Sequence, residues 1–178
     1  AIGYQAADGV TTGDRNLVIG YQAMGDSGGA TVLDSDDNTF IGYQSGGGTW
    51  VTAKNNKNVG IGNHTLDAAM NGAVNNVGVG YGALSALTEG DNNVAIGAFS
   101  GDAITTGSRN TVVGYNSLTA STGGWYNVAL GYGALSGVST DYNTGVGYGA
   151  GSTISSGKSN TCIGFSADVD AAADNYQL

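Results

Sequence analysis

The chain contains no proline, one cysteine, one histidine and only five basic residues among its 178 positions. A single cysteine cannot form a disulfide within the chain and cannot supply a cysteine-based metal site. Fourteen acidic residues bring the net charge to −9, and no basic stripe exists to displace counterions from phosphates, which argues against nucleic acid. No apolar run approaches the roughly 18 residues of a membrane helix, so we expect no membrane span in this segment.

Glycine is abundant, with 33 copies, and it occurs without the proline that collagen requires. Hydrophobic residues make up 40% of the chain and include ten tyrosines, too many for a disordered polar tail. The composition therefore predicts a folded chain rich in turns.

One short phrase recurs along the whole sequence: asparagine, two variable residues, an aliphatic residue and glycine. The glycine column is Gly3, Gly20, Gly42, Gly62, Gly80, Gly97, Gly114, Gly131, Gly147 and Gly164. Successive spacings are 17, 22, 20, 18, 17, 17, 17, 16 and 17 residues. Ten copies at a period near 17 indicate a repeat architecture that occupies residues 1–178 as one domain. Because the chain begins within a phrase, AIGYQA, we expect it to be a fragment of a longer fibrous protein.

A period of 17 is too short for two helices and a turn. Each copy carries β-branched residues at alternate positions, as in Val94 and Ile96, which is typical of a strand. A second apolar segment follows the glycine, as in YGALS at 81–85, and a turn rich in Thr, Gly, Asp and Asn completes the copy. We therefore predict an all-β parallel β-solenoid of about ten coils, with two short strands in each coil.

The recurring asparagine is expected to form a hydrogen-bonded ladder from coil to coil, and it also tolerates left-handed turns. The expected ladder residues are Asn76, Asn93, Asn110, Asn127, Asn143 and Asn160. The glycine after the aliphatic residue is expected to permit a bend or the close approach of another backbone.

The strand residues are predicted to point in alternating directions. Positions one and three after each asparagine form one apolar face, which we assign to the inside of the coil. The middle position is then expected to face outwards, yet it holds small uncharged residues that need cover from another chain. The expected interface residues are Ala95, Val112, Ala129 and Cys162, and the simplest partner is the same chain in a homotrimer.

The phrases NVAIGAFS (93–100), NVALGYGA and NTVVGYNS resemble the YadA-type head repeats of trimeric autotransporter adhesins. TTGSRNTVVGYNSL is also similar to repeats of phage and bacterial tail-fibre proteins. The resemblance covers essentially the whole chain, although the period near 17 is longer than in the adhesin heads. It implies a left-handed β-roll wound into a homotrimer that serves as a rigid stalk or adhesive head.

Two longer turns, 25–37 and 46–57, account for the spacings of 22 and 20, and insertions in solenoids emerge as surface loops. They are the candidate recognition surface for a host glycan or a protein receptor, with tolerated loop slack as the alternative. Their candidate residues are Asp34, Asp36, Asp37, Trp50, Lys54 and Lys57. A tyrosine column after the glycine, including Tyr21, Tyr81 and Tyr132, is interpreted as a stiffening aromatic ladder more readily than as a sugar-binding strip.

No catalytic set can be assembled from the sequence. His64 occupies an ordinary repeat column, no cluster offers three metal ligands, and DSDDN (34–38) lacks the glycine and glutamate of a calcium loop. We expect no cofactor, no metal and no enzymatic activity.

The sequence therefore favours a structural and adhesive fibre segment, the shaft or head of a virion tail fibre that mediates host attachment. A bacterial trimeric autotransporter-like surface adhesin is the alternative, and an ice-binding solenoid is a minor one. Either main function places the chain on a virion or an extracellular appendage.

Overall fold

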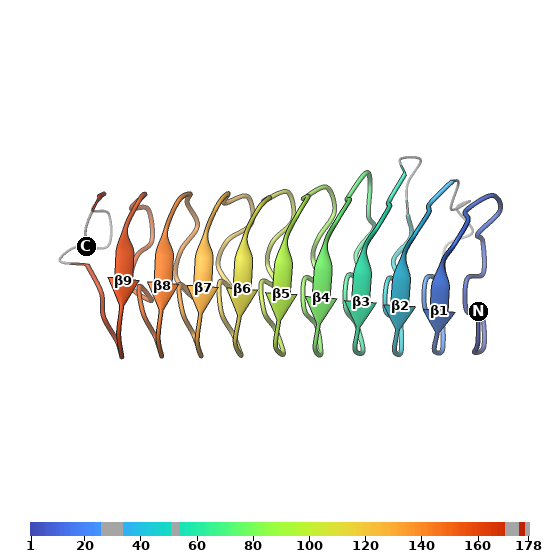
Figure 1. The fold of residues 1–178 in the computed structure, drawn as a ribbon, viewed down its shortest axis with the longest axis horizontal. Helices are drawn as coiled ribbons and strands as arrows, with labels where there is room; N and C mark the ends of the chain where they lie inside the picture. The colour runs from blue at the N-terminus through green and yellow to red at the C-terminus, as the bar shows by residue number, and fades with distance from the viewer. Residues whose placement is uncertain (26–33, 51–53, 170–174, 177–178) are drawn as a thin grey trace.

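The computed structural model describes residues 1–25, 34–50, 54–169 and 175–176. Within them lies one sheet of nine parallel strands that pair strictly in chain order, β1 to β9. Figure 1 shows the strands side by side along a rod, with the N-terminus and the C-terminus at opposite ends. The predicted all-β parallel solenoid with a repeat near 17 residues is confirmed.

Each strand is three residues long and begins directly after a repeat asparagine. The strands are β1 (Leu17–Ile19), β2 (Thr39–Ile41), β3 (Val59–Ile61), β4 (Val77–Val79), β5 (Val94–Ile96), β6 (Thr111–Val113), β7 (Val128–Leu130), β8 (Thr144–Val146) and β9 (Thr161–Ile163). An isolated bridge between Ile2 and Ile19 continues the same order at the N-terminus.

Each described coil contains one strand rather than the two that the sequence pattern suggested. The second apolar segment, as in YGALS, is a series of turns. Two residues of that segment adopt left-handed backbone conformations in most coils, for example His64 with φ 56° and Leu66 with φ 50°. A β-strand cannot include such conformations, so the segment curls back and buries its leucine instead.

The glycine column lets neighbouring coils approach at the end of each strand. Gly97 has φ 128°, and a Cβ built on it would lie 2.6 Å from the carbonyl oxygen of Gly114 in the next coil. The same contact recurs at Gly114, whose Cβ would lie 2.3 Å from the oxygen of Gly131. No other residue fits, because both the φ value and the space exclude a side chain.

The direction of the strand side chains is opposite to the prediction. The middle residue of every strand is buried inside its own coil, and positions one and three face outwards or are half-buried. The predicted interface residues are therefore core residues: Ala95, Val112 and Ala129 have no exposed surface, and Cys162 has 4%. Small residues occupy this column because leucines and isoleucines from the turns fill the same narrow interior, not because another chain approaches.

Candidate functional site: an aromatic and charged patch on the turns

The repeat asparagines form a continuous buried column. In each rung, the side-chain oxygen of one asparagine accepts a hydrogen bond from the backbone amide of the next, at 2.9–3.0 Å. The side-chain amide of Asn93 also donates to the carbonyl oxygen of Gly107 in the following turn, at 2.9 Å. The column extends from Asn16 through Asn38 to Asn160, and it links strand, turn and neighbouring coil.

A second polar column occupies the turn position two residues before each asparagine. There, a side-chain oxygen accepts the backbone amide hydrogen of the equivalent residue one coil earlier. The pairs are Asp14 to Asp36, Asp36 to Asn56, Val74 to Asp91, Asp91 to Ser108, Trp125 to Asp141 and Lys158 to Asn175. This position therefore favours a short side chain with an acceptor oxygen.

Trp125 is one of three residues, with Val74 and Lys158, that interrupt this second column. Its indole carries only a donor, so it cannot accept the amide hydrogen of Ser108 as an aspartate or asparagine would. The next residue, Tyr126, lies in the adjacent turn column with φ 58°, and Tyr142 follows one coil later with φ 63°. Asparagine, arginine and lysine occupy the same column in other coils at nearly the same φ. The fold therefore accepts many side chains here and has no need of the three aromatic ones.

These aromatic side chains gather on the outside of the coils. Tyr126 and Tyr142 stack with ring centroids 5.2 Å apart and an angle of 6° between the rings. Trp125 lies 6.2 Å from Tyr126 at a tilt of 45°. The guanidinium carbon of Arg109 lies 5.5 Å from the Trp125 ring and 5.3 Å from the Tyr126 ring, within cation–π distance. We call Arg109, Trp125, Tyr126, Asp141 and Tyr142 the turn patch.

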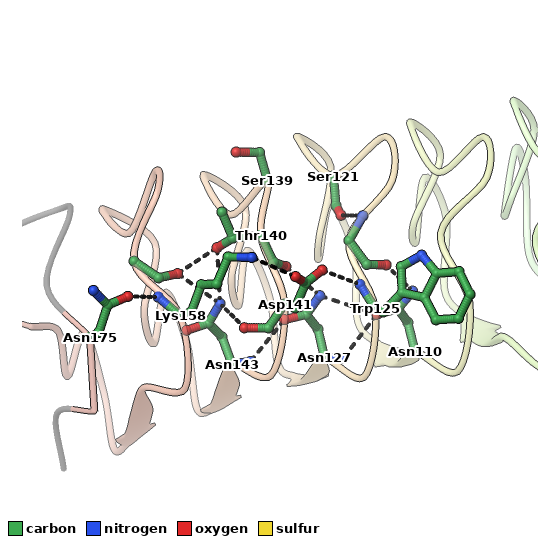
Figure 2. A network of polar contacts seen from close by, with 12 residues as sticks. Asn110, Ser121, Trp125, Asn127, Ser139, Thr140, Asp141, Asn143, Lys158 and Asn175 are labelled. Atoms are coloured by element: carbon green, nitrogen blue, oxygen red, sulfur yellow. Dashed lines mark hydrogen bonds and ion pairs between the residues drawn. The ribbon is translucent and has the colours of Figure 1, made fainter.

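The carboxylate of Asp141 connects Trp125 of the turn patch with Lys158 of the next coil (Figure 2). One oxygen accepts from the Trp125 amide at 3.0 Å, and the other accepts from the Lys158 ammonium at 2.8 Å. The hydrogen bond from Lys158 is the main reason that the pKa of Asp141 lies below its usual value. The same pairing raises the pKa of Lys158. Asp141 is therefore charged at neutral pH, and Lys158 neutralises it.

An open, shallow pocket of about 380 Å³ lies at this point, lined by Gly123, Trp125, Tyr126, Asp141 and Tyr142. Its two best-exposed rings are Tyr142 at 56% and Tyr126 at 42%, and Trp125 is 40% exposed. Sequence reasoning missed this site. The available signal was a Trp-Tyr pair followed one coil later by Asp-Tyr, at two turn positions that hold Asp, Asn, Ser, Val and basic residues in the preceding coils.

The tyrosine column forms a ladder of ten rings along the rod. Two copies lack an aromatic residue at the expected position, where Asn63 and Ala98 stand, and there the next residue, His64 or Phe99, supplies the ring. Centroid distances between successive rings are 5.0–6.1 Å. Because most rings stack face to face, their faces cover one another and their edges meet solvent, which fits a stiffening role rather than a sugar platform.

The predicted recognition turns are partly described; residues 26–33 and 51–53 lie outside the described part of the chain. Lys54 pairs with Asp34 at 3.0 Å, and Arg15 pairs with Asp37 at 2.6 Å. An oxygen of Asp36 accepts the Asp14 amide hydrogen, and the Lys57 amide donates to the Asp36 carbonyl oxygen. These charged residues lie together and connect neighbouring coils.

Trp50 does not project from its turn, contrary to our expectation. It is 1% exposed, and its ring packs edge-on against Phe40 at 5.7 Å. The longer turn supplies room for this large side chain to fold back, because Phe40 and Trp50 together fill the core beside Gly46 and Gly60.

His64 pairs with Asp67, with 2.9 Å between the ring Nδ1 and a carboxylate oxygen. Burial is the main cause that raises the pKa of Asp67, and the hydrogen bond from His64 opposes it. The described ranges hold no cluster of three or more His, Cys, Asp or Glu that could bind a metal. A search of the same residues finds no helix with the length and hydropathy that crossing a membrane demands.

Comparison of the chain with protein-family models, with curated proteins and with solved structures gave no match.

Proposed function

We propose that this chain is a non-enzymatic structural and adhesive fibre segment, the shaft or head of a virion tail fibre that attaches to a host surface. The rod geometry supports the proposal, because each strand pairs only with its neighbours in chain order (Figure 1). A molecule of this shape extends by adding identical coils, which suits a spacer or stalk.

The observation that carries the proposal is the outward face of the sheet. Positions one and three of the strands present aliphatic and threonine side chains to solvent, with no charge in either column. Ile61 and Ile96 are 40% and 42% exposed, and Leu17 is 49% exposed. A continuous apolar face of nine strands is larger than a lone soluble chain ordinarily exposes.

Copies of the same chain cover this face in our proposal, and the resemblance to YadA-type heads supports three copies around a common axis. Parallel rods repeat the same contact at every coil, so the buried apolar area grows with length. The net charge of −9 per chain does not oppose this contact, since the charged residues occupy the turns and the ends. A bacterial trimeric surface adhesin uses the same geometry and is the second candidate.

The test is the native mass of the protein by light scattering, together with its shape by small-angle X-ray scattering. The wild-type protein should have three times the mass of the 17.6 kDa chain and should scatter as a rod. Ile96→Asp places a charge on the outward face and should yield folded protein of lower mass. Thr106→Asp adds the same charge to an exposed turn and should leave the assembly intact. A wild-type protein that is a folded monomer would contradict the proposal.

To separate the two candidates, labelled protein is offered to bacterial cells and to surfaces coated with animal extracellular matrix. Binding to bacterial cells favours the tail fibre, and binding to the matrix favours the adhesin.

A further inference from the structure

We infer that the turn patch binds a saccharide that carries a carboxylate group. The inference deepens the proposed adhesive function by naming a site and a ligand class, and it rests on that function for its biological meaning. The site differs from the long turns singled out by the sequence, and it lies near the C-terminal half of the rod.

The first argument is that the turn patch gathers aromatic side chains that the fold does not require. Six residues of the Trp125 column supply acceptor oxygens to the preceding coil, whereas Val74, Trp125 and Lys158 supply none. The Tyr126 column holds asparagine, arginine, lysine and serine at nearly the same backbone φ. Neither column needs an aromatic ring, so three neighbouring rings on one stretch of a regular fold point to a role beyond the fold.

The second argument is the shape and chemistry of the pocket. It is shallow and open, and three partly exposed rings and the Asp141 carboxylate line it. The Arg109 guanidinium lies beside it, against two of the same rings. Asp141 already accepts from Trp125 and Lys158, but a fully apolar ligand would offer no polar partner to the Arg109 guanidinium. A sugar ring offers an apolar C–H face for an aromatic ring and a rim of hydroxyls for Asp141 and Arg109. This match of one apolar face with polar edges favours a saccharide.

The third argument concerns charge. Arg15, Lys54 and Lys158 each form an ion pair with an aspartate, whereas Arg109 takes part in none of the ion pairs among the described residues. Its guanidinium lies against two rings instead, where it is exposed and held in place. Because Lys158 neutralises Asp141, the turn patch carries the net charge of Arg109. The positive charge of Arg109 would repel a cationic ligand. A carboxylate would pair with the guanidinium through two parallel hydrogen bonds.

The full chain is tested by isothermal titration calorimetry with 3′-sialyllactose and with oligomers of guluronate as acidic probes. Lactose and cellohexaose are the neutral probes. At least one acidic probe should bind, and each neutral probe should bind about tenfold more weakly or not at all. Tryptophan fluorescence gives a second readout, because Trp125 is exposed and Trp50 is buried.

The decisive variant is Trp125→Asn. Asparagine restores the acceptor that the Ser108 amide lacks, as Asn56 does for Asp36 and Asn175 does for Lys158. The variant should keep or raise the thermal midpoint while it weakens binding about tenfold. Arg109→Gln should abolish the preference for acidic probes. Arg15→Gln, in the same repeat column but far along the rod, is the matched control and should bind as the wild type does.

The inference is overturned if the wild-type protein binds neither acidic probe, or binds neutral and acidic probes equally. It is also overturned if Trp125→Asn and Arg109→Gln bind as tightly as the wild type. A rod-shaped trimer that fails to bind would end this inference and leave the fibre proposal standing. A folded monomer that binds through Trp125 would support the site and end the fibre proposal.

Discussion

The side-chain oxygen of Asn76 accepts two hydrogen bonds from Asn93, one from its backbone amide at 3.0 Å and one from its side-chain amide at 3.1 Å. Asn93 offers its own oxygen to Asn110 in the same way. The repeat asparagines from Asn38 to Asn160 are buried, and those from Asn38 to Asn143 bond to the asparagines of both neighbouring coils.

Asn93→Ala should therefore lower the free energy of unfolding by about 3 kcal/mol, because the buried amides of Asn110 lose their acceptor. Chemical denaturation followed by circular dichroism measures the loss. The exposed neighbour Asn92 is the control, and Asn92→Gly should change the stability by less than about 0.5 kcal/mol since glycine accepts φ 58°. Equal stability of Asn93→Ala and the wild type would contradict the ladder's role.

Gly97→Ala should cost about 3 kcal/mol or more, because the new methyl group would lie 2.6 Å from the Gly114 oxygen. Gly164 provides a matched control. It lies in the same column with nearly the same φ, 130°, but the nearest heavy atom to the added Cβ lies 3.7 Å away, so Gly164→Ala should cost only the backbone strain of about 1–2 kcal/mol. The thermal midpoints of the two variants test whether the lack of space or the backbone conformation excludes a side chain from the glycine column. Similar midpoints would show that the close approach is unimportant.

Ala129→Asp tests the direction of the strand side chains. Ala129 has no exposed surface inside its own coil, so the charge would be buried without a partner and the chain should fail to fold. Ile96→Asp, on the outward face, should remain folded. Circular dichroism of both purified variants gives the answer. A folded Ala129→Asp protein that merely dissociates would restore the original interface assignment.

The ring ladder can be tested by moving one ring along the chain. Phe99→Asn should lower the stability by about 1 kcal/mol, since it removes the ring between Tyr81 and Tyr115. Adding Ala98→Tyr places a ring at the position used by the neighbouring coils and should recover most of that loss. Urea unfolding of both single variants and the double variant completes the cycle. Strict additivity of the two substitutions would exclude the ladder as a source of stability.

Asp102 should make the protein more stable in mild acid. Burial raises the pKa of its carboxyl group above the usual value, and one of its buried oxygens has no hydrogen-bond partner among the described residues. The folded state then binds this proton more tightly than the unfolded chain does. The contribution to stability is present below the unfolded pKa of about 3.9 and is lost as the pH rises through the raised folded pKa.

Asp102→Asn should accordingly stabilise the protein at pH 7, and its advantage should shrink towards pH 4. Unfolding midpoints across this range measure the difference. Asp91→Asn is the charge-matched control; its side-chain oxygen already accepts the Val74 amide hydrogen, so we expect no such gain. An advantage of Asp102→Asn that does not vary with pH would contradict the assignment to Asp102.

The sequence alone predicts the period, the parallel order and the close approach at glycines such as Gly97, because a residue repeated at one point of every coil must meet its own copies. It does not predict which face of the strand is inside. Ala95 and Val94 are both apolar, and alternation alone cannot separate a small core residue from a β-branched outer one. The prediction of a second strand in each coil was wrong because residues such as Leu66 adopt a left-handed backbone conformation. A leucine in the sequence does not indicate that conformation.

The candidate site lies in turns of ordinary length that carry unusual aromatic residues. It does not lie in the two longer turns, 25–37 and 46–57. Trp50 seemed suited to a surface loop, but the core had a space of its size beside Phe40. Trp125 lies in a turn of ordinary length, which gives no sign of a binding site. What marks the site is the cluster of three rings that the stacked coils bring together from Trp125, Tyr126 and Tyr142.

The strict pairing of each coil with the next determines how the rod responds to a pulling force. Hydrogen bonds between parallel strands lie along the long axis, so tension on the two ends loads the coil-to-coil contacts in series. The coils at the two ends have a neighbour on one side only and should detach first. Each released coil of about 17 residues would add roughly 60 Å of extended chain. A fibre with this property yields in steps and shortens again as the coils rewind.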